Sequence, residues 1–205
     1  MQQTCVEGVW MWSRWQPDRA MNFNSYLIQG KENIVVDPLV CDDAAIEQLR
    51  VLGGVAWIVL TNRDHERASR ELANTFGAKI AAPALDVPML SGPVDRELGH
   101  GDTIGALRVV SFEGMKSPGE CALFLAPQSA VFIGDALLGD PVGSLRMLPD
   151  EKLADAGRAA LSLRALRALA PKHVLTGDGA PIFNDASAAL DRFLRSRPTA
   201  ARDND

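Results

Sequence analysis

Residues able to do acid–base or metal chemistry gather in one short stretch, TNRDHER at 61–67, directly after the apolar run VAWIVL at 55–60. The stretch supplies an amide, two acids, an imidazole and a permanent cation, in the order Asn62, Asp64, His65, Glu66 and Arg67. Carboxylates and imidazole can bind a metal ion or exchange protons, whereas a guanidinium remains charged and cannot act as a ligand. The composition therefore indicates a functional site but leaves its kind open.

Three further polar turns each follow an apolar strand: FEGMKSPGE at 112–120, GDALLGD at 134–140 and TGDGAP at 176–181. In layered α/β folds, ligand sites gather at the carboxyl ends of strands. Lys116, Asp135 and Asp178 are therefore candidates to join the first stretch. Local roles compete with this interpretation, since acids at a helix start cap backbone N–H groups and Gly-Asp pairs are common in turns.

The bulk properties restrict the class of protein. The 205 residues predict a single domain at 1–197 and a disordered tail at 198–205. A net charge of −5 with interspersed signs argues against a nucleic-acid partner, and no apolar run is long enough to cross a membrane. No secretory signal is visible. The cysteines, at positions 5, 41 and 121, are predicted to be reduced core residues of a cytoplasmic protein.

The hydrophobic pattern of the first half alternates between strands and helices. We expect strands at 5–15, 25–30, 33–38, 55–60 and 78–83, with the second and third forming a hairpin. Helices are expected at 42–52 and from the TNRDHER stretch to Phe76, where Gly77 ends the second one. Three tryptophans in the first strand indicate strand packing, with a dimer or ligand surface as the alternative; they are Trp10, Trp12 and Trp15.

The second half has a different order of elements. Residues 83–105 are rich in Pro, Gly and Asp and predict a loop with short elements. Three strands at 106–112, 121–126 and 130–135 leave no room for helices between them, which indicates an antiparallel meander. A helix at 151–169, a strand at 173–179 and a helix at 184–196 complete an α/β (α+β) layered fold.

Several of these segments resemble the metallo-β-lactamase-fold superfamily, which includes glyoxalase II and ribonuclease Z. The resemblance covers roughly residues 20–195 and rests on five segments: NFNSYLIQGKENIVVDP, VLTNRDHERASRELANTFGAKIAAP, FEGMKSPGECALFL, VFIGDALL and VLTGDGAPI. They resemble, in order, the family's opening hairpin, its T-H-x-H-x-D-H segment, its T-P-G-H-T-P-G-S segment, the strand with its bridging aspartate, and its last strand. The resemblance implies a four-layer αββα sandwich with the site along one edge.

The family's metal ligands are largely replaced in this sequence. With Thr61 as anchor, four ligand positions of the first segment hold Asn62, Asp64, Glu66 and Arg67, and His65 falls between them. Met115 stands at the histidine position of the third segment, Asp178 replaces the last histidine, and Asp135 retains the aspartate. Aligning Asp64 and His65 with the family's D-H pair is a second register, which requires a two-residue deletion.

Two kinds of site remain. In one, Asp64, Asp135 and Asp178 bind a divalent ion such as Mg²⁺ or Mn²⁺, with Zn²⁺ as a less favoured choice. In the other, no metal cofactor is bound, and the Arg67 guanidinium bridges Asp135 and Asp178. We favour the second, because it explains the arrival of a cation and the loss of histidines together. Glu66 belongs to the candidate set, while Asn62, His65 and Lys116 are secondary candidates.

Two functions follow from these alternatives. The resemblance implies a divergent hydrolase of an ester, thioester or phosphoester that no longer has the usual dizinc site. The residues themselves favour a non-catalytic binding or structural protein with a salt bridge in place of the metal. The sequence does not identify the small-molecule ligand or substrate.

Overall fold

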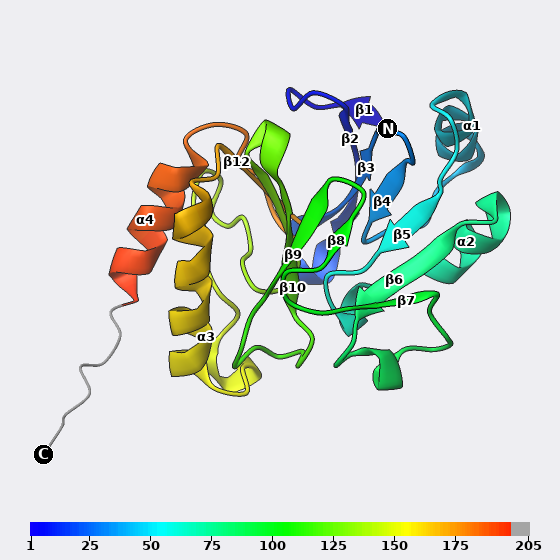
Figure 1. Ribbon diagram of the computed structural model, residues 1–205. Coiled ribbons are helices and arrows are strands. Elements are labelled where there is room, and N and C mark those ends of the chain that lie inside the picture. The colour runs from blue at the N-terminus through cyan, green and yellow to red at the C-terminus, as the bar shows by residue number, and fades with distance from the viewer. Residues whose placement is uncertain (198–205) are drawn as a thin grey trace, which may run out of the picture.

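The structure of this protein is a computed structural model that describes residues 1–197, so the predicted tail at 198–205 lies outside the described residues. Two β-sheets pack face to face, and helices cover the outer face of each sheet (Figure 1). The predicted αββα sandwich is therefore confirmed. Apolar residues separate the layers, because each sheet buries one face on the other sheet and one on helices.

The first sheet has seven strands in the order β1-β2-β3-β4-β5-β6-β7. The strands are β1 (Gln2–Gln3), β2 (Val9–Gln16), β3 (Met21–Ile28), β4 (Ile34–Val36), β5 (Trp57–Val59), β6 (Lys79–Pro83) and β7 (Arg96–Leu98). Strands β1 to β4 pair antiparallel, which includes the predicted hairpin. Strands β4 to β7 pair parallel, and helices connect β4 to β5 and β5 to β6.

The second sheet has five strands in the order β12-β11-β10-β9-β8. They are β8 (Thr103–Ile104), β9 (Leu107–Ser111), β10 (Cys121–Leu125), β11 (Ala130–Ile133) and β12 (His173–Thr176). The pairs from β8 to β11 are antiparallel, as the predicted meander requires, and β11 pairs parallel with β12. The parallel pair brings the carboxyl ends of β11 and β12 to the same edge of this sheet.

Helices α1 (Asp43–Val51) and α2 (Ser69–Phe76) cover the first sheet, and α3 (Ala156–Ser162) and α4 (Ala186–Ser196) cover the second (Figure 1). Asp42 caps α1 by accepting a hydrogen bond from the Ala45 N–H, and Gly77 ends α2 in the left-handed conformation, with φ of 66°. Within residues 1–197, the helices are all too short or too polar to span a bilayer.

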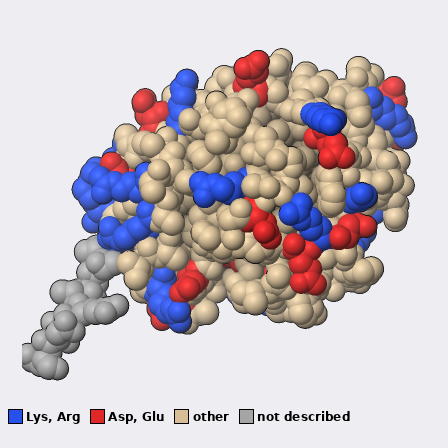
Figure 2. All heavy atoms as spheres, viewed as in Figure 1, with Lys and Arg blue, Asp and Glu red and all other residues tan. Residues whose placement is uncertain are grey.

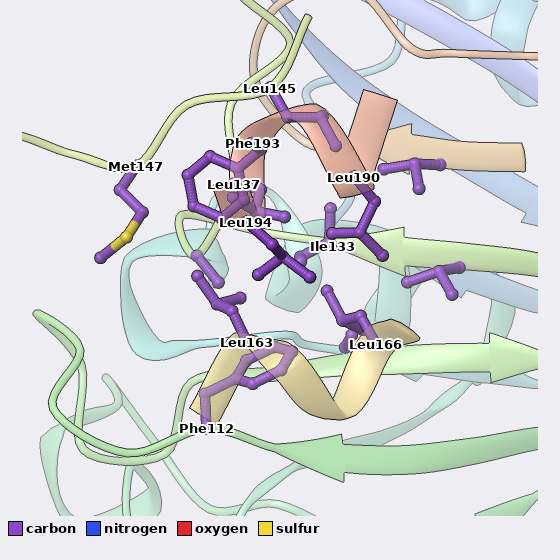
Figure 3. Packing of buried hydrophobic residues seen from close by; sticks show 14 of the residues in the cluster. Phe112, Ile133, Leu137, Leu145, Met147, Leu163, Leu166, Leu190, Phe193 and Leu194 are labelled. Atoms are coloured by element: carbon purple, nitrogen blue, oxygen red, sulfur yellow. The ribbon is translucent and has the colours of Figure 1, made fainter. Parts of the chain in front are cut away.

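Three apolar clusters hold the layers together. One fills the space between the sheets, a second lies between the first sheet and α1 and α2, and a third lies between the second sheet and α3 and α4. In the third cluster, Leu163 and Leu166 face Leu190 and Phe193 across the sheet residue Ile133 (Figure 3). The same cluster takes up Leu137, Leu145 and Met147, which anchors the long segment after β11 next to the candidate site.

Side-chain hydrogen bonds join the two sheets at the edge that carries the site. Asn24 of β3 is buried, and its Nδ2 donates to the carbonyls of Thr176 and Gly179 at 2.9 and 2.8 Å. The hydroxyl of Tyr26 donates to the same Thr176 carbonyl at 2.7 Å. Strand β3 and the turn that follows β12 are therefore fixed relative to each other before any charged side chain is considered.

Two predicted elements are shorter than expected. The first strand begins at Val9 rather than at residue 5, because a tight turn ends at Gly8, which has φ of 73°. The predicted helix at 151–169 is interrupted. Leu153 is extended, the Asp155 carboxylate caps a new start at α3, and residues 163–169 form a 3₁₀ helix.

Surface and cysteine positions add detail to the sequence predictions. Only Cys121 of the three cysteines is buried, so the prediction of core cysteines is wrong for the exposed Cys5 and the half-buried Cys41.

Trp12 is buried, while Trp15 is 59% exposed. Basic and acidic side chains alternate over the face shown in Figure 2, and neither sign covers a large continuous area there.

Candidate functional site

The ends of four parallel-paired strands bring together the polar residues of the site. Asp37 follows β4, Thr61 follows β5, Asp135 follows β11 and Asp178 follows β12. All four strand ends lie at the edge where the sheets are joined. This placement agrees with the rule that ligand sites form beyond the carboxyl ends of strands.

His65 lies at the centre of the cluster. Its Nδ1 is 2.7 Å from Oδ2 of Asp37, and its Nε2 is 3.4 Å from Oδ1 of Asp135 and 3.9 Å from Oδ1 of Asp178. The 3₁₀ turn Arg63–His65 presents the imidazole inward. His65 was a secondary sequence candidate, and the structure places it closer to both carboxylates than Asp64, which forms no part of this group.

Asp37 is a buried carboxylate that supports His65 from behind. The backbone N–H of Thr61 donates to its Oδ1 at 2.8 Å, and the Thr61 hydroxyl donates to its Oδ2 at 2.6 Å. Asp37 itself has φ of 50°, a left-handed conformation that costs a non-glycine residue on the order of 1–2 kcal/mol. Residues held in such conformations cluster at functional sites, so the strained Asp37 supports a functional role for this edge.

The Arg67 guanidinium occupies the space in front of His65. Its Nη2 lies 2.8 Å from Oδ1 of Asp178 and 3.0 Å from Nε2 of His65, and its Nη1 donates to the Asn24 carbonyl at 3.1 Å. The guanidinium carbon is 5.0 Å from the ring centre of Phe23, a cation–π distance. Like Asp37, Arg67 has a positive φ, of 38°.

The predicted bridge from Arg67 to both aspartates forms only in part. Among the described residues, the ion pair within 4.0 Å joins Arg67 to Asp178 alone. Asp135 is instead neutralised by His65 and by the Lys116 ammonium, whose Nζ lies 3.8 Å away. The backbone N–H of Ala136 donates to Oε1 of the buried Glu120 at 3.2 Å. This bond fixes the turn that directs Asp135 toward His65.

Lys116 and Asp64 form an ion pair at the solvent-facing side of the cluster. Their Nζ–Oδ2 distance is 2.6 Å, and both side chains are more than a third exposed. Asp64 is thus bound to a lysine rather than aimed at Asp135 and Asp178, as a metal ligand would be. Such an exposed pair contributes at most about 1 kcal/mol to stability.

Glu66 points away from the site. Its Oε1 accepts from Arg70 at 2.8 Å and from the Ser91 hydroxyl at 2.7 Å, and its Oε2 accepts from the Ser91 N–H at 2.9 Å. These bonds tie the start of α2 to the loop at 87–93. Although Glu66 adjoins Arg67 in sequence, it is separated from the cluster by the backbone.

The charges of the cluster fix one another's protonation. Burial and the adjacent Arg67 lower the pKa of His65, but the Asp37 charge and hydrogen bonds to Asp135 and Asp37 outweigh them and raise its pKa to about 10. Burial raises the pKa of Asp135, yet its hydrogen bond and attraction to His65 dominate and lower its pKa to about 2. The imidazolium therefore donates to Asp37 and toward Asp135, while Asp178 and Asn24 hold the guanidinium beside it.

Two functional candidates were missed in the sequence, Asp37 and Glu120. Glu120 is fully buried below the site; its Oε1 accepts from Asn62 Nδ2 at 3.2 Å, and its Oε2 has no partner among the described residues. Burial raises the pKa of Glu120 well above its ordinary value, and the nearby Asp135 charge raises it further. Asn62 in turn accepts from the His65 N–H at 3.1 Å, so Glu120 supports His65 through Asn62.

Comparisons with known proteins identify the family. The family model described as the metallo-beta-lactamase superfamily matches residues 1–196. The chain therefore belongs to the metallo-β-lactamase superfamily, whose hydrolase-like fold it shares. A comparison with curated protein sequences found no match.

Solved structures show the same fold at low sequence identity. A metallo-beta-lactamase from Pontibacter korlensis is 16% identical, with a TM-score of 0.74 over 94% of this chain and 97% of that one. The metallo-beta-lactamase FIM-1 from Pseudomonas aeruginosa, in a mono-zinc form, is 17% identical, with a TM-score of 0.71 over 96% and 95%. A metallo-beta-lactamase family protein from Thermus thermophilus is 20% identical, with a TM-score of 0.68 over 92% and 79%.

Two residues at positions where the family resemblance places metal ligands have other contacts in the structure. Asn62 is buried and committed to Glu120 and the His65 backbone, and Met115 lies in the apolar cluster beneath α3. In residues 1–197, one group of three metal-ligating side chains occurs, His65, Asp135 and Asp178, with ligand atoms within 4.8 Å of one another. The guanidinium of Arg67 donates to Asp178 of that group at 2.8 Å and lies 3.0 Å from Nε2 of His65.

Proposed function

We propose that this protein is a metal-independent, ligand-binding member of the metallo-β-lactamase superfamily, in which Arg67 takes the place of a metal ion. The observation that carries the proposal is the position of the guanidinium, which lies 2.8 Å from Asp178 and 3.0 Å from His65. A fixed cation at this point neutralises buried carboxylates that would otherwise cost several kcal/mol. It would also repel a second cation approaching the same carboxylates.

The protonation of His65 supports the same proposal. A metal ligand must be a neutral imidazole, and a general base must have a free lone pair. The Asp37 charge and hydrogen bonds to Asp135 and Asp37 raise the pKa of His65 to about 10, so this imidazole would have to lose a proton before it served either role. The Asp37–His65 pair has the orientation of a catalytic dyad, but its imidazole has no capacity to accept a further proton.

Metal analysis tests this proposal. The protein is purified without chelator or metal-affinity resin, its metal content is measured by mass spectrometry, and thermal unfolding is followed with added Mn²⁺, Mg²⁺ or Zn²⁺. We expect substoichiometric metal and an unchanged Tm. A stoichiometric ion, or a Tm that rises with metal concentration as ligand binding requires, would overturn the proposal.

A second candidate is a hydrolase of an ester, thioester or phosphoester with one divalent ion. Two observations favour it: the 4.8 Å grouping of His65, Asp135 and Asp178, and the carboxylate of Asp37 behind the imidazole. A carboxylate in that position is the usual partner of a metal-binding histidine. This function requires Arg67 to leave the cluster and His65 to lose a proton. Stabilisation of the protein by an added metal ion would favour this hydrolase over the metal-independent protein.

A further inference from the structure

The candidate site opens into a cleft that can hold a small organic molecule. The cleft has a volume of about 590 Å³, within the range typical of ligand pockets. The charged cluster forms part of its lining, and apolar side chains from β3 and from loops of both sheets complete it: Met21, Phe23, Leu39, Leu138, Leu148 and Pro149. A ligand that fills this cleft therefore needs an apolar body.

The basic side chains of the cleft fall into two groups. Arg67 and Lys116 are committed to Asp178 and Asp64. Arg19, Arg146 and Lys152 also line the cleft, on segments outside the cluster. Arg146 forms an ion pair with Asp140, whereas Arg19 and Lys152 have no ion-pair partner within 4.0 Å in the described part of the chain.

The acids outside the cluster do not balance this second group. With Arg146 paired to Asp140, Asp18 is the one carboxylate there that lines the cleft, against the two unpaired basic side chains. Arg19 and Lys152 are both exposed, so they can reorient toward a ligand without breaking a contact. An excess of unpaired cations beside apolar walls attracts negative charge and raises the rate of encounter with anions.

We infer that the ligand is an amphipathic organic anion, with an apolar body in the cleft and a carboxylate or phosphate head group bound by Arg19 and Lys152. This inference rests on the proposed function, because an anionic head group would bind to a metal ion in the cluster, if one were present, instead of to Arg19 and Lys152. With Arg67 and Lys116 already paired, the unpaired cations are the better partners for the head group. Arg19 and Lys152 thereby become specificity-determining residues.

Calorimetric titration with matched eight-carbon probes tests the inference. Octanoate, octyl phosphate, octylammonium and 1-octanol share an apolar body and differ in head-group charge and chemistry. We expect saturable one-to-one binding of an anionic probe, weaker binding of octanol and none of octylammonium. The two anions distinguish a carboxylate from a phosphate ligand. Binding of neither anion, or equal binding of octylammonium, would overturn the inference.

Variants locate the head group. Arg19→Met and Lys152→Met remove charge from exposed side chains, and we expect the double variant to bind the anionic probe about tenfold more weakly at low salt. Lys31→Met, in the exposed turn between β3 and β4, is the matched control and should leave affinity unchanged. Unchanged affinity in the folded double variant would refute the assigned contacts. The metal analysis tests the proposed function separately from these titrations. A metal-free protein that binds neither anionic probe would therefore refute only this inference.

Discussion

At the scale of single residues, each carboxylate of the buried cluster lies beside a cationic side chain, and the set keeps one negative charge in excess. Asp37, Asp135 and Asp178 are opposed by His65 and Arg67, and the exposed Lys116–Asp64 pair completes the set. Each buried charge has a charged partner, which is the condition for keeping charges out of water. Under our proposal Arg67 acts as a structural cation, and its removal should cost more free energy than the loss of one contact.

Arg67→Met should destabilise the protein by about 3–5 kcal/mol, because the Asp178 carboxylate loses its cationic partner inside the fold. Asp178→Asn in the same chain should recover part of that loss, since the unpaired carboxylate is then absent. Urea unfolding of the four proteins in the double-mutant cycle measures the coupling. As a control, Arg158→Met breaks an exposed pair with Glu113 and should cost less than about 1 kcal/mol. An effect of Arg67→Met no larger than the control would show that the guanidinium is dispensable.

The raised pKa of His65 predicts how stability depends on pH. The native state holds the His65 proton up to a pKa of about 10, while the unfolded state releases it near 6.5. Its contribution is therefore complete below pH 6.5 and is lost progressively as pH rises toward 10. Unfolding free energies measured across this window should fall for the wild type. His65→Gln should be less stable at about pH 6 and show a flatter profile, and parallel profiles for the two proteins would contradict the assignment.

At the scale of elements, two loops at the site are fixed by one buried carboxylate, Asp86. It accepts from the Arg63 N–H at 2.8 Å, from the Ser117 hydroxyl at 2.5 Å and from the Gly119 N–H at 2.8 Å. Gly119 has room only for hydrogen here, because a Cβ would lie 2.6 Å from the Asp86 carboxyl carbon. The turns that carry His65 and Lys116 are thus joined through a residue outside the charged cluster.

Asp86→Ala should lower the free energy of unfolding by about 3 kcal/mol, since it leaves buried donors unsatisfied. Amide hydrogen exchange should accelerate in both loops, at residues 61–65 and 113–119, more than in β4 or β12. Asp140→Ala, which breaks the exposed pair with Arg146, provides the comparison and should leave both loops protected. Loss of protection in only one of the two loops would show that Asp86 does not join them.

The elements also show what the sequence could predict. Periodicity and glycine positions predicted the strands and helices of an α/β layered fold, because these are local signals, whereas the αββα arrangement and the site at its edge were implied by the family resemblance. The partners of Asp37 and Glu120 were missed because those contacts join residues far apart in sequence. Glu66 and Arg67 are neighbours that face opposite ways, and that difference depends on the positive φ of Arg67, which the sequence does not reveal. The alignment with the family's ligand positions identified Arg67 as a site candidate, whereas the pairing of Asp135 with His65 could be seen only in the structure.

At the scale of the whole molecule, the site depends on the junction of the two sheets. Asn24 of the first sheet holds the carbonyls of Thr176 and Gly179, which flank the turn carrying Asp178. Its own backbone carbonyl accepts from Arg67. One buried amide therefore links the sheet junction to both members of the Arg67–Asp178 pair.

Asn24→Ala should destabilise the protein by about 2–3 kcal/mol, because the Gly179 carbonyl loses the Asn24 donor and the Thr176 carbonyl loses one of its two side-chain donors. Binding of an anionic probe should weaken as well, since the turn at Asp178 lines the cleft. Tyr26→Phe removes a single hydrogen bond to the same Thr176 carbonyl and should cost about 1 kcal/mol. Thermal and urea unfolding rank the two variants; a Tyr26→Phe cost equal to that of Asn24→Ala would contradict this description of the junction.

Our central proposal is that the Arg67 guanidinium takes the place of a metal ion. A crystal structure of protein soaked in Zn²⁺ and Mn²⁺, with anomalous scattering used to locate ions, tests it most directly. We predict Arg67 hydrogen-bonded to Asp178 beside His65, with no anomalous peak in the cluster. An ion bound by His65, Asp135 and Asp178, with Arg67 displaced toward solvent, would contradict the claim.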